Sequence, residues 1–304
     1  MRIVLHGQQA FGQAVLEKLL DRNENIVAVC SAPTKEGKKE DPLVAFAREK
    51  GLPIHQPASW KTPEALKLMK SFDADVCMMA YVLLFVPKEV CDAPKYGTFQ
   101  YHPSLCPDHR GPSSINWPIA MGKKRTGLSI FWPNDGLDEG PIMIQKTCEI
   151  GADETLGDVY FKKLFPMGVD AMLEGLDLVK AGVLIKHDQR LDSGSYESWF
   201  DRAAAEINWS SPVDDVYNLI RAANPAPGAW TTFNGKELKV YDIVSIDGAG
   251  DPGVVLSINE NGTTIQSNGG RIIVKRVRPA GGEKMTSQEW AEAEGIVPGQ
   301  KLGV

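Results

Sequence analysis

Two residues whose types suit proton transfer lie in the stretch of residues 100–140. His102 follows a β-prone segment, and Asp138 lies in an acidic turn that follows a second β-prone run. An imidazole beside a carboxylate can move protons and stabilise a developing negative charge. A histidine after a strand can equally be a structural hydrogen-bonding group, and Asp-Gly turns are common hairpin chemistry. The two residue types alone therefore leave a catalytic and a structural interpretation open.

The segments around this stretch predict an α/β fold. Residues 2–6 form a short apolar run, a helix is expected through about residue 20, and residues 26–30 are again apolar. Residues 74–81 are almost continuously apolar, as in parallel strands buried on both faces. We therefore expect a Rossmann-like, mostly parallel sheet with helices on both faces. Because ligands in such folds bind beyond the carboxyl ends of the strands, the turns that carry His102 and Asp138 are predicted to meet there.

The opening unit invites comparison with a dinucleotide-binding motif, which it does not match. Its glycines, Gly7 and Gly12, are separated by four residues instead of following the GxGxxG pattern. No acidic residue closes the second strand to hold a ribose, because Ser31 stands there. We therefore expect no NAD(P) cofactor.

A second domain is predicted after residue 203. Residues 155–180 have long helical periodicity with a break expected at residues 165–166, and residues 184–200 are predicted to be a linker folded over the first domain. Residues 213–223 predict a helix, and short β-prone runs separated by Asn-Gly and Asp-Gly turns follow. This spacing predicts a small OB-like barrel. The expected domains are residues 1–203 and 204–304.

Composition excludes several classes of protein. Of the 304 residues, 43% are hydrophobic and 24% are charged, which is ordinary globular composition. The chain has no apolar run of the ~20 residues that a membrane span needs, and its start lacks a signal-peptide pattern. Five scattered cysteines without metal-binding spacing predict reduced thiols in a cytoplasmic protein. The net charge of −6 gives no bulk attraction for nucleic acid.

Three motifs carry a resemblance to a known family. They are HPSLCPDHRGPSSINW (residues 102–117), TGLSIFW (126–132) and DGLDEGPIMIQ (135–145). They resemble the folate-dependent formyltransferase family, over nearly the whole chain. Within that family the sequence motifs are most similar to those of the hydrolase domain of 10-formyltetrahydrofolate dehydrogenase. They are second most similar to those of methionyl-tRNA formyltransferase. The resemblance implies an enzyme that uses 10-formyltetrahydrofolate as formyl donor, without a metal.

The resemblance also implies roles for individual residues. His102 would donate to the oxyanion of a tetrahedral intermediate, and Asp138 would transfer protons. Amine-transferring members carry an asparagine where this chain has Gln100, which keeps the amide but adds a methylene. Cys106 is not expected to be a thiol nucleophile, because no basic residue is fixed beside it. The implied folate-binding residues are Gln8, Phe11, Tyr81, Leu84, Phe85, Val86, Ser104, Asp135 and Gly136.

The acceptor of the formyl group is left open, as water or a small amine. Methionyl-tRNA is the closest alternative, but acidic residues outnumber basic ones in the second domain, which disfavours tRNA because phosphate contacts dominate nucleic-acid affinity. We expect the chain to lack the further domains needed for the full dehydrogenase reaction. A non-catalytic folate-binding protein is the alternative from another class.

Overall fold

The structure, a computed structural model, describes residues 1–303. Its contacts divide the chain into two compact units. The first unit comprises residues 1–111, 127–148 and 163–196, and the second comprises residues 112–126, 149–162 and 197–304. The predicted domain boundary between residues 203 and 204 stays a prediction. Among the described residues, no helix combines the length and the apolarity that crossing a membrane requires.

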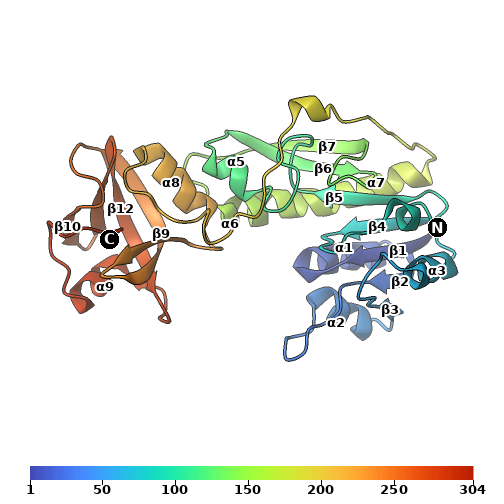
Figure 1. The fold of residues 1–304 in the computed structure, drawn as a ribbon. Helices are drawn as coiled ribbons and strands as arrows, with labels where there is room; N and C mark the ends of the chain where they lie inside the picture. The colour runs from blue at the N-terminus through green and yellow to red at the C-terminus, as the bar shows by residue number, and fades with distance from the viewer. Residues whose placement is uncertain (304) are drawn as a thin grey trace. The chain divides into compact units, whose positions relative to one another are not determined.

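The first unit is built on one seven-stranded sheet with the strand order β3-β2-β1-β4-β5-β6-β7 (Figure 1). The strands are β1 (Arg2–Gly7), β2 (Asn25–Cys30), β3 (Ile54–His55), β4 (Val76–Ala80), β5 (Thr98–His102), β6 (Arg125–Phe131) and β7 (Ile142–Glu149). Neighbours from β3 to β5 are parallel. The predicted Rossmann-like, mostly parallel sheet is therefore confirmed.

One strand direction differs from the expectation. β6 pairs with β5 in the antiparallel direction, with Gln100 opposite Phe131 and His102 opposite Ser129. The carboxyl ends of β5 and β6 therefore lie at opposite edges of the sheet. The two site-bearing turns cannot meet in the way that carboxyl ends of parallel strands do, and the turn after β6 must fold back to reach His102.

Helices cover both faces of this sheet, because successive strand residues point to opposite faces. One core cluster joins residues such as Ile3, Met78 and Phe99 to the helices α1, α2 and α7. The other joins Cys77 and Met79 to α3 and α4. These helices are α1 (Gln9–Asp21), α2 (Pro42–Glu49), α3 (Pro63–Ser71), α4 (Lys88–Cys91) and α7 (Phe165–Lys180).

The long helical segment after β7 is divided at the predicted place. It consists of α6 (Leu156–Val159), the π-helical turn η1 (Tyr160–Leu164) and α7. Thr155 caps the start of α6 in a capping box with Asp158. Pro166 lies in the first turn of α7, where a missing amide proton costs no helical hydrogen bond.

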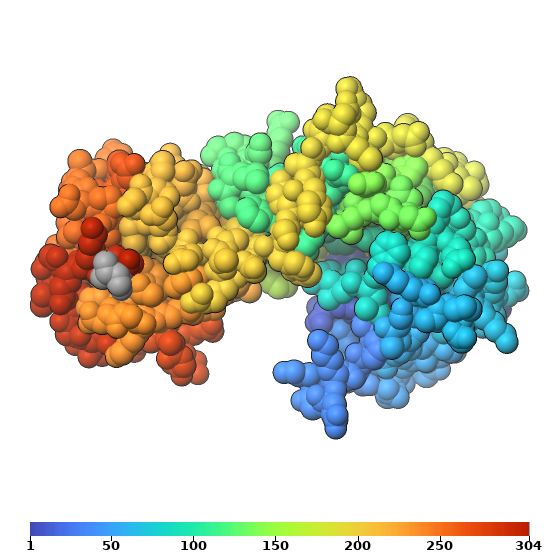
Figure 2. Space-filling model, viewed as in Figure 1, coloured from blue at the N-terminus to red at the C-terminus, as the bar shows by residue number. Residues whose placement is uncertain are grey.

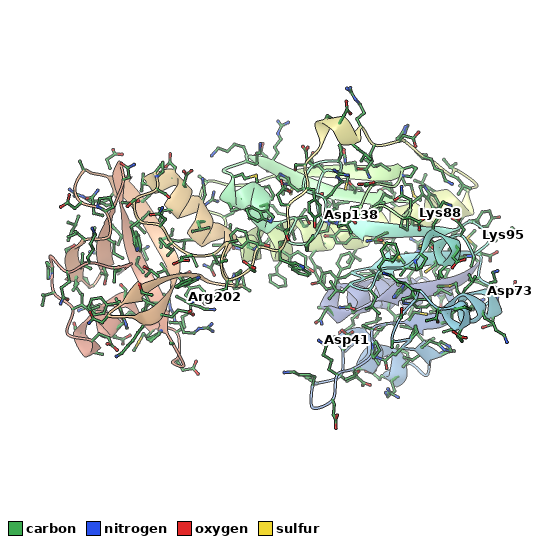
Figure 3. The ribbon with its side chains drawn as sticks, in the orientation of Figure 1. Asp41, Asp73, Lys88, Lys95, Asp138 and Arg202 are labelled. Carbon is green, nitrogen blue, oxygen red and sulfur yellow. The ribbon has the colours of Figure 1, made fainter. Side chains whose placement is uncertain are left out.

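The loop between β2 and α2 projects from the surface of the first unit (Figures 1 and 2). Asp41 ends this loop, and its carboxylate accepts from the amide of Leu43 at 2.9 Å, which caps α2. The same carboxylate accepts from the amide of Gln9 at 2.8 Å, at the start of α1. Asp41 therefore ties the β1–α1 turn to the base of the loop (Figure 3).

The second unit contains an antiparallel sheet with the strand order β10-β11-β12-β9-β8, and β13 pairs with β12. Its elements are α5 (Asn116–Ala120), α6, α8 (Val213–Ala222), β8 (Ala229–Phe233), β9 (Lys236–Asp247), β10 (Val255–Asn259), β11 (Gly262–Ser267), β12 (Gly270–Pro279), β13 (Met285–Thr286) and α9 (Ser287–Ala293). The predicted helix and short strands are confirmed. The OB-like closure of the sheet stays a prediction.

Candidate active site

His102 is the last residue of β5, and the strand directs its side chain to one face of the sheet. Side chains two residues apart on a strand share a face. Gln100 and His102 therefore point to the same side, while Tyr101 points to the other, where its ring stacks on Phe11 with 4.2 Å between centroids. The histidine side chain is buried, with 7% of the residue exposed.

A backbone carbonyl fixes the orientation of the His102 ring. Nε2 lies 3.1 Å from the carbonyl oxygen of His109. A carbonyl oxygen can only accept, so Nε2 must carry the proton in this contact. The other ring nitrogen, Nδ1, faces Asp138, with 3.7 Å between Nδ1 and Oδ2. The ring nitrogen available for chemistry is therefore Nδ1.

Asp138 lies in the loop that joins β6 to β7. The amide of Trp132 donates to the carbonyl oxygen of Pro141 at 2.9 Å and closes this loop at its base. Gly140 is required at the closure, because a Cβ there would lie 1.7 Å from the carbonyl oxygen of Trp132. The loop thereby turns back from the end of β6 and brings Asp138 to His102, beside β5 and β6 (Figure 3).

Asp138 is held in an unusual backbone conformation. Its φ of 55° is left-handed, a region that is uncommon for non-glycine residues but enriched in Asp and Asn. The residue is 8% exposed, and Oδ2 accepts from the amide of Gly111 at 2.9 Å. The second carboxylate oxygen, Oδ1, takes no part in the contacts with Gly111 and His102. The arrangement is a buried carboxylate beside an oriented imidazole.

A cavity of about 150 Å³ adjoins this pair within the first unit. Gln100 lines the cavity. Among the described residues, none forms a hydrogen bond with the side-chain amide of Gln100. The apolar loop of residues 82–86 forms another wall. Six of the predicted site residues line the cavity: Leu84, Phe85, Val86, Gln100, Gly136 and Asp138. A flat ring with a polar edge could bind between the apolar loop and these polar groups.

Phe11 and Ser104, for which the resemblance implies folate binding, do not line the cavity. Phe11 is 1% exposed and belongs to the core on the opposite face of the sheet, because its helix packs under Tyr101. Ser104 is fully buried, and its hydroxyl donates to the carbonyl oxygen of Asp108 at 2.7 Å. The sequence pattern could not distinguish a core phenylalanine from a ligand-facing one.

The remaining predicted folate-binding residues border the cavity loops without lining the cavity. The amide of Gln8 donates to the carbonyl oxygen of Ala80 at 3.3 Å. Tyr81 comes directly after Ala80, has a left-handed φ of 67°, and precedes the apolar loop of residues 82–86. Asp135 is exposed and accepts from the amide of Lys88 at 3.0 Å, which ties the Asp138 loop to the start of α4.

Two neighbours of the pair have clear structural roles. Arg110 donates to Glu139 at 2.8 Å and so fixes the residue that follows Asp138. Cys106 is 2% exposed, and burial raises the pKa of its thiol to about 11. A thiol with such a pKa stays protonated near neutral pH and is a poor nucleophile, in agreement with the expectation for Cys106.

Sequence reasoning missed two residues that support the pair, Gln189 and Ser195. Gly111 belongs to the family motif of residues 102–117, but nothing in the sequence marks its amide as a partner of Asp138. Gln189 and Ser195 lie in the segment predicted only as a linker. The contacts of this segment with the site are long-range in sequence, and no short-range pattern predicts them.

Among the described residues, no group of three or more histidine, cysteine or acidic residues could hold a metal ion.

The fold and the site together define an α/β protein with a buried histidine–aspartate pair beside a small cavity. The family model described as "Formyl transferase" matches residues 1–173, and that described as "Formyl transferase, C-terminal domain" matches residues 201–295. The chain belongs to the formyl transferase family.

Two of the curated relatives differ in how much of their own length the chain covers. The mitochondrial 10-formyltetrahydrofolate dehydrogenase of Mus musculus is 34% identical over 293 residues, which cover 91% of this chain and 31% of that protein. The chain thus spans about a third of the length of such relatives. The methionyl-tRNA formyltransferase of Geotalea daltonii is 32% identical over 308 residues, which cover 100% of this chain and 98% of that protein.

Solved structures share the fold at low identity. HypX from Aquifex aeolicus, in complex with tetrahydrofolic acid, has a TM-score of 0.70 and 18% identity, covering 97% of this chain and 48% of that one. An N-formyltransferase from Helicobacter canadensis, in complex with folinic acid and dTDP-3-aminofucose, has a TM-score of 0.68 and 18% identity. That comparison covers 90% of this chain and 98% of the other.

Proposed function

We propose that the chain removes the formyl group of 10-formyltetrahydrofolate and passes it to water or to an amine. The observation that carries the proposal is the buried pair of His102 and Asp138, with 3.7 Å between Nδ1 and Oδ2, beside a cavity lined by Gln100 and Asp138. Membership of the formyl transferase family and relatives named for formyl-folate chemistry support it.

The cavity suits the pterin end of a folate. Its apolar wall is the loop of residues 82–86, and its other lining includes Asn134, Gly136 and Asp138. Ligand sites of this kind are lined mainly by apolar side chains and contain a few polar groups that fix orientation. The exposed side chains Leu83 and Phe85 belong to the same loop and would cover the ring. The formyl group would then lie toward Gln100 and the pair.

The first chemical step forms a tetrahedral intermediate. The oxygen of water, or the nitrogen of an amine, bonds to the formyl carbon while the carbonyl electrons move onto the formyl oxygen. Asp138 takes the proton of the attacking group. His102, through Nδ1, and the side-chain amide of Gln100 donate to the oxyanion, which such donors stabilise most when they are oriented in advance. The His109 carbonyl supplies this orientation through Nε2.

The second step breaks the bond between the formyl carbon and N10. The oxyanion electrons restore the carbonyl, and N10 takes the proton that Asp138 holds. Tetrahydrofolate leaves, and the other product is a formylated amine or formic acid, which loses its proton to the solvent to give formate. A single carboxylate thus acts first as base and then as acid, so Asp138 needs no second acidic residue.

Water or a small amine is favoured over methionyl-tRNA as acceptor. Residues 204–304 contain twelve Asp and Glu against nine Lys and Arg, a net charge of −3. Phosphate contacts made by basic side chains dominate the affinity of proteins for nucleic acid. The methionyl-tRNA formyltransferase relative, which matches the whole chain, keeps transfer to methionyl-tRNA as the second candidate.

The deciding experiment measures tetrahydrofolate release from 10-formyltetrahydrofolate. It is run without acceptor, with initiator methionyl-tRNA, and with a panel of amino sugars and small amines. Turnover without acceptor supports hydrolysis, and turnover only with an amine supports transfer to that amine. Turnover only with tRNA supports the second candidate. Folate binding without any turnover, unchanged in His102→Ala, would instead indicate a non-catalytic folate-binding protein.

A further inference from the structure

The segment of residues 185–196, here called the strap, crosses both loops that carry the proposed active site. It follows α7 and contains little regular structure apart from the 3-10 turn η2 (Leu191–Ser193). Ile185 at its start packs against the core, but Leu191 and Tyr196 further along are exposed, so hydrophobic contacts do not explain the course of the rest of the strap. The strap is held by hydrogen bonds, and these converge on the two loops around His102 and Asp138.

The first part of the strap is fixed in register against the Asp138 loop. The amide of His187 donates to the carbonyl oxygen of Ile142 at 3.0 Å, and the reverse bond is 2.8 Å. The indole nitrogen of Trp132 donates to the carbonyl oxygen of Ile185 at 2.8 Å. Trp132 and Ile142 flank the loop at its two ends. The strap therefore has a defined position over the loop. Gln189 lies beside the loop residues between Trp132 and Ile142.

Gln189 holds the backbone on both sides of Glu139. Its Nε2 donates to the carbonyl oxygen of Asp138 at 2.9 Å and to that of Gly140 at 2.7 Å. Both amide protons of the side chain are thus used on this one loop. One of the bonds is made to the carbonyl of Asp138 itself, which has a left-handed φ of 55°.

The C-terminal end of the strap contacts the loop that orients His102. The Ser195 hydroxyl accepts from the amide of His109 at 2.9 Å, and the Ser195 carbonyl accepts from the amide of Arg110 at 3.1 Å. The carbonyl of the same His109 accepts from Nε2 of His102. One segment therefore restrains both the carboxylate and the peptide that orients the imidazole.

We infer that Gln189 is a positioning residue, which holds Asp138 at the distance and angle to His102 that proton transfer requires. The inference rests on the proposed function. Gln189 does not line the cavity, so it is not expected to contact the folate. Its loss should therefore change the rate of the chemical step much more than the binding of the formyl donor.

The test compares Gln189→Leu with a matched variant, Gln56→Leu. Gln56 also donates its Nε2 to a backbone carbonyl, that of Ala32 at 2.7 Å, but it follows the edge strand β3. A misplacement of about 1 Å can cost on the order of a hundredfold in rate. We therefore expect kcat to fall about 10- to 100-fold in Gln189→Leu, with KM for 10-formyltetrahydrofolate within about threefold. Gln56→Leu should keep kcat.

A second measurement follows the loop itself, so that it does not depend on activity. Amide hydrogen exchange in residues 134–140 should become at least about tenfold faster in Gln189→Leu and stay unchanged in Gln56→Leu. If the wild-type protein releases no tetrahydrofolate with any acceptor, the proposed function fails, and this exchange still decides whether Gln189 holds the loop. If Gln189→Leu does not fold, Gln189→Glu replaces it, because a carboxylate keeps the size but cannot donate.

Three outcomes would overturn the inference. One is a Gln189 variant with wild-type kcat and wild-type exchange in residues 134–140. Another is a change confined to KM, which would place Gln189 in substrate binding. The third is an equal loss of kcat in Gln56→Leu, which would mean that activity follows general stability.

Discussion

His102 donates from Nε2 to the carbonyl oxygen of His109, seven positions further along the chain, at 3.1 Å. The bond commits one ring nitrogen to the backbone and turns the other toward Asp138. It also links the ring to the loop of residues 103–111, in which the amide of His109 donates to the Ser195 hydroxyl. Chemistry at Nδ1 therefore depends on the conformation of residues 103–111 as a whole.

Replacing Asp138 by asparagine tests the proton-transfer role. Asparagine tolerates left-handed backbone and can still accept from Gly111, so the fold should be kept. Without a carboxylate, kcat for tetrahydrofolate release should fall about a hundredfold or more. The measurement is steady-state kinetics together with thermal unfolding. Wild-type kcat in Asp138→Asn would remove Asp138 from the mechanism.

Gly140→Ala tests the closure of the Asp138 loop. The added Cβ would lie 1.7 Å from the carbonyl oxygen of Trp132, which no rotamer can relieve. We expect the free energy of unfolding to fall by about 1–3 kcal/mol and activity to be largely lost. Gly282→Ala is the control, because its Cβ would meet nothing nearer than 3.5 Å. Equal stability of the two variants, measured by denaturant unfolding, would contradict the expectation.

Cys106→Ala tests whether the thiol takes part in catalysis. Burial raises the pKa of Cys106 to about 11, so the thiol is protonated at neutral pH. We expect kcat to stay within about threefold of the wild-type value. A kinetic assay of tetrahydrofolate release checks this. A loss as large as that of Asp138→Asn would show that sulfur chemistry had been wrongly excluded.

His6 predicts a loss of stability in mild acid. The ring is 2% exposed and packs against Trp60 with 4.8 Å between centroids, and burial lowers its pKa from 6.5 to about 3. The unfolded chain therefore binds a proton between these values that the folded chain does not, so the free energy of unfolding decreases as the pH falls below 6.5. The facing strands place Cys30 and Met79 opposite His6.

The measurement compares the wild-type protein with His6→Phe at pH 7.5 and pH 5.5. His6 alone should cost the wild-type protein roughly 1.4 kcal/mol over this interval, because the unfolded-state pKa lies one unit above the lower pH. His6→Phe keeps a ring beside Trp60 and should lack this part of the pH dependence. Identical pH dependence in the two proteins would show that His6 is accessible to protons in the folded state.

Some of this architecture could be predicted from the sequence, for identifiable physical reasons. Continuous apolar runs predict buried parallel strands. His102 and Asp138 lie in motifs that are specific enough to indicate the family. The direction of β6 could not be predicted, because the 22 residues between β5 and β6 (103–124) are long enough for either direction. The position of Phe11 in the core could not be predicted, because the periodicity of a helix does not say which residues of the sheet it will contact.

The supports of the site were harder to predict than its reactive groups. Gln189 and Ser195 act through backbone atoms far away in sequence, and such contacts depend on tertiary structure alone. Their residue types are common in connecting segments. Cys106 was set aside as a nucleophile from the sequence, and its burial, which raises the pKa of the thiol to about 11, supports that interpretation.

The strap also determines where the first unit can be cut. The first family match ends at residue 173, whereas the hydrogen bonds to the two site loops come from residues 185–195. A protein truncated after residue 173 would contain His102 and Asp138 and every strand of the first sheet, yet none of the strap's hydrogen bonds to the two loops. We therefore expect a fragment that retains the proposed activity to extend past residue 173 to the end of the strap. A protease that cuts the strap should reduce that activity without contacting the cavity.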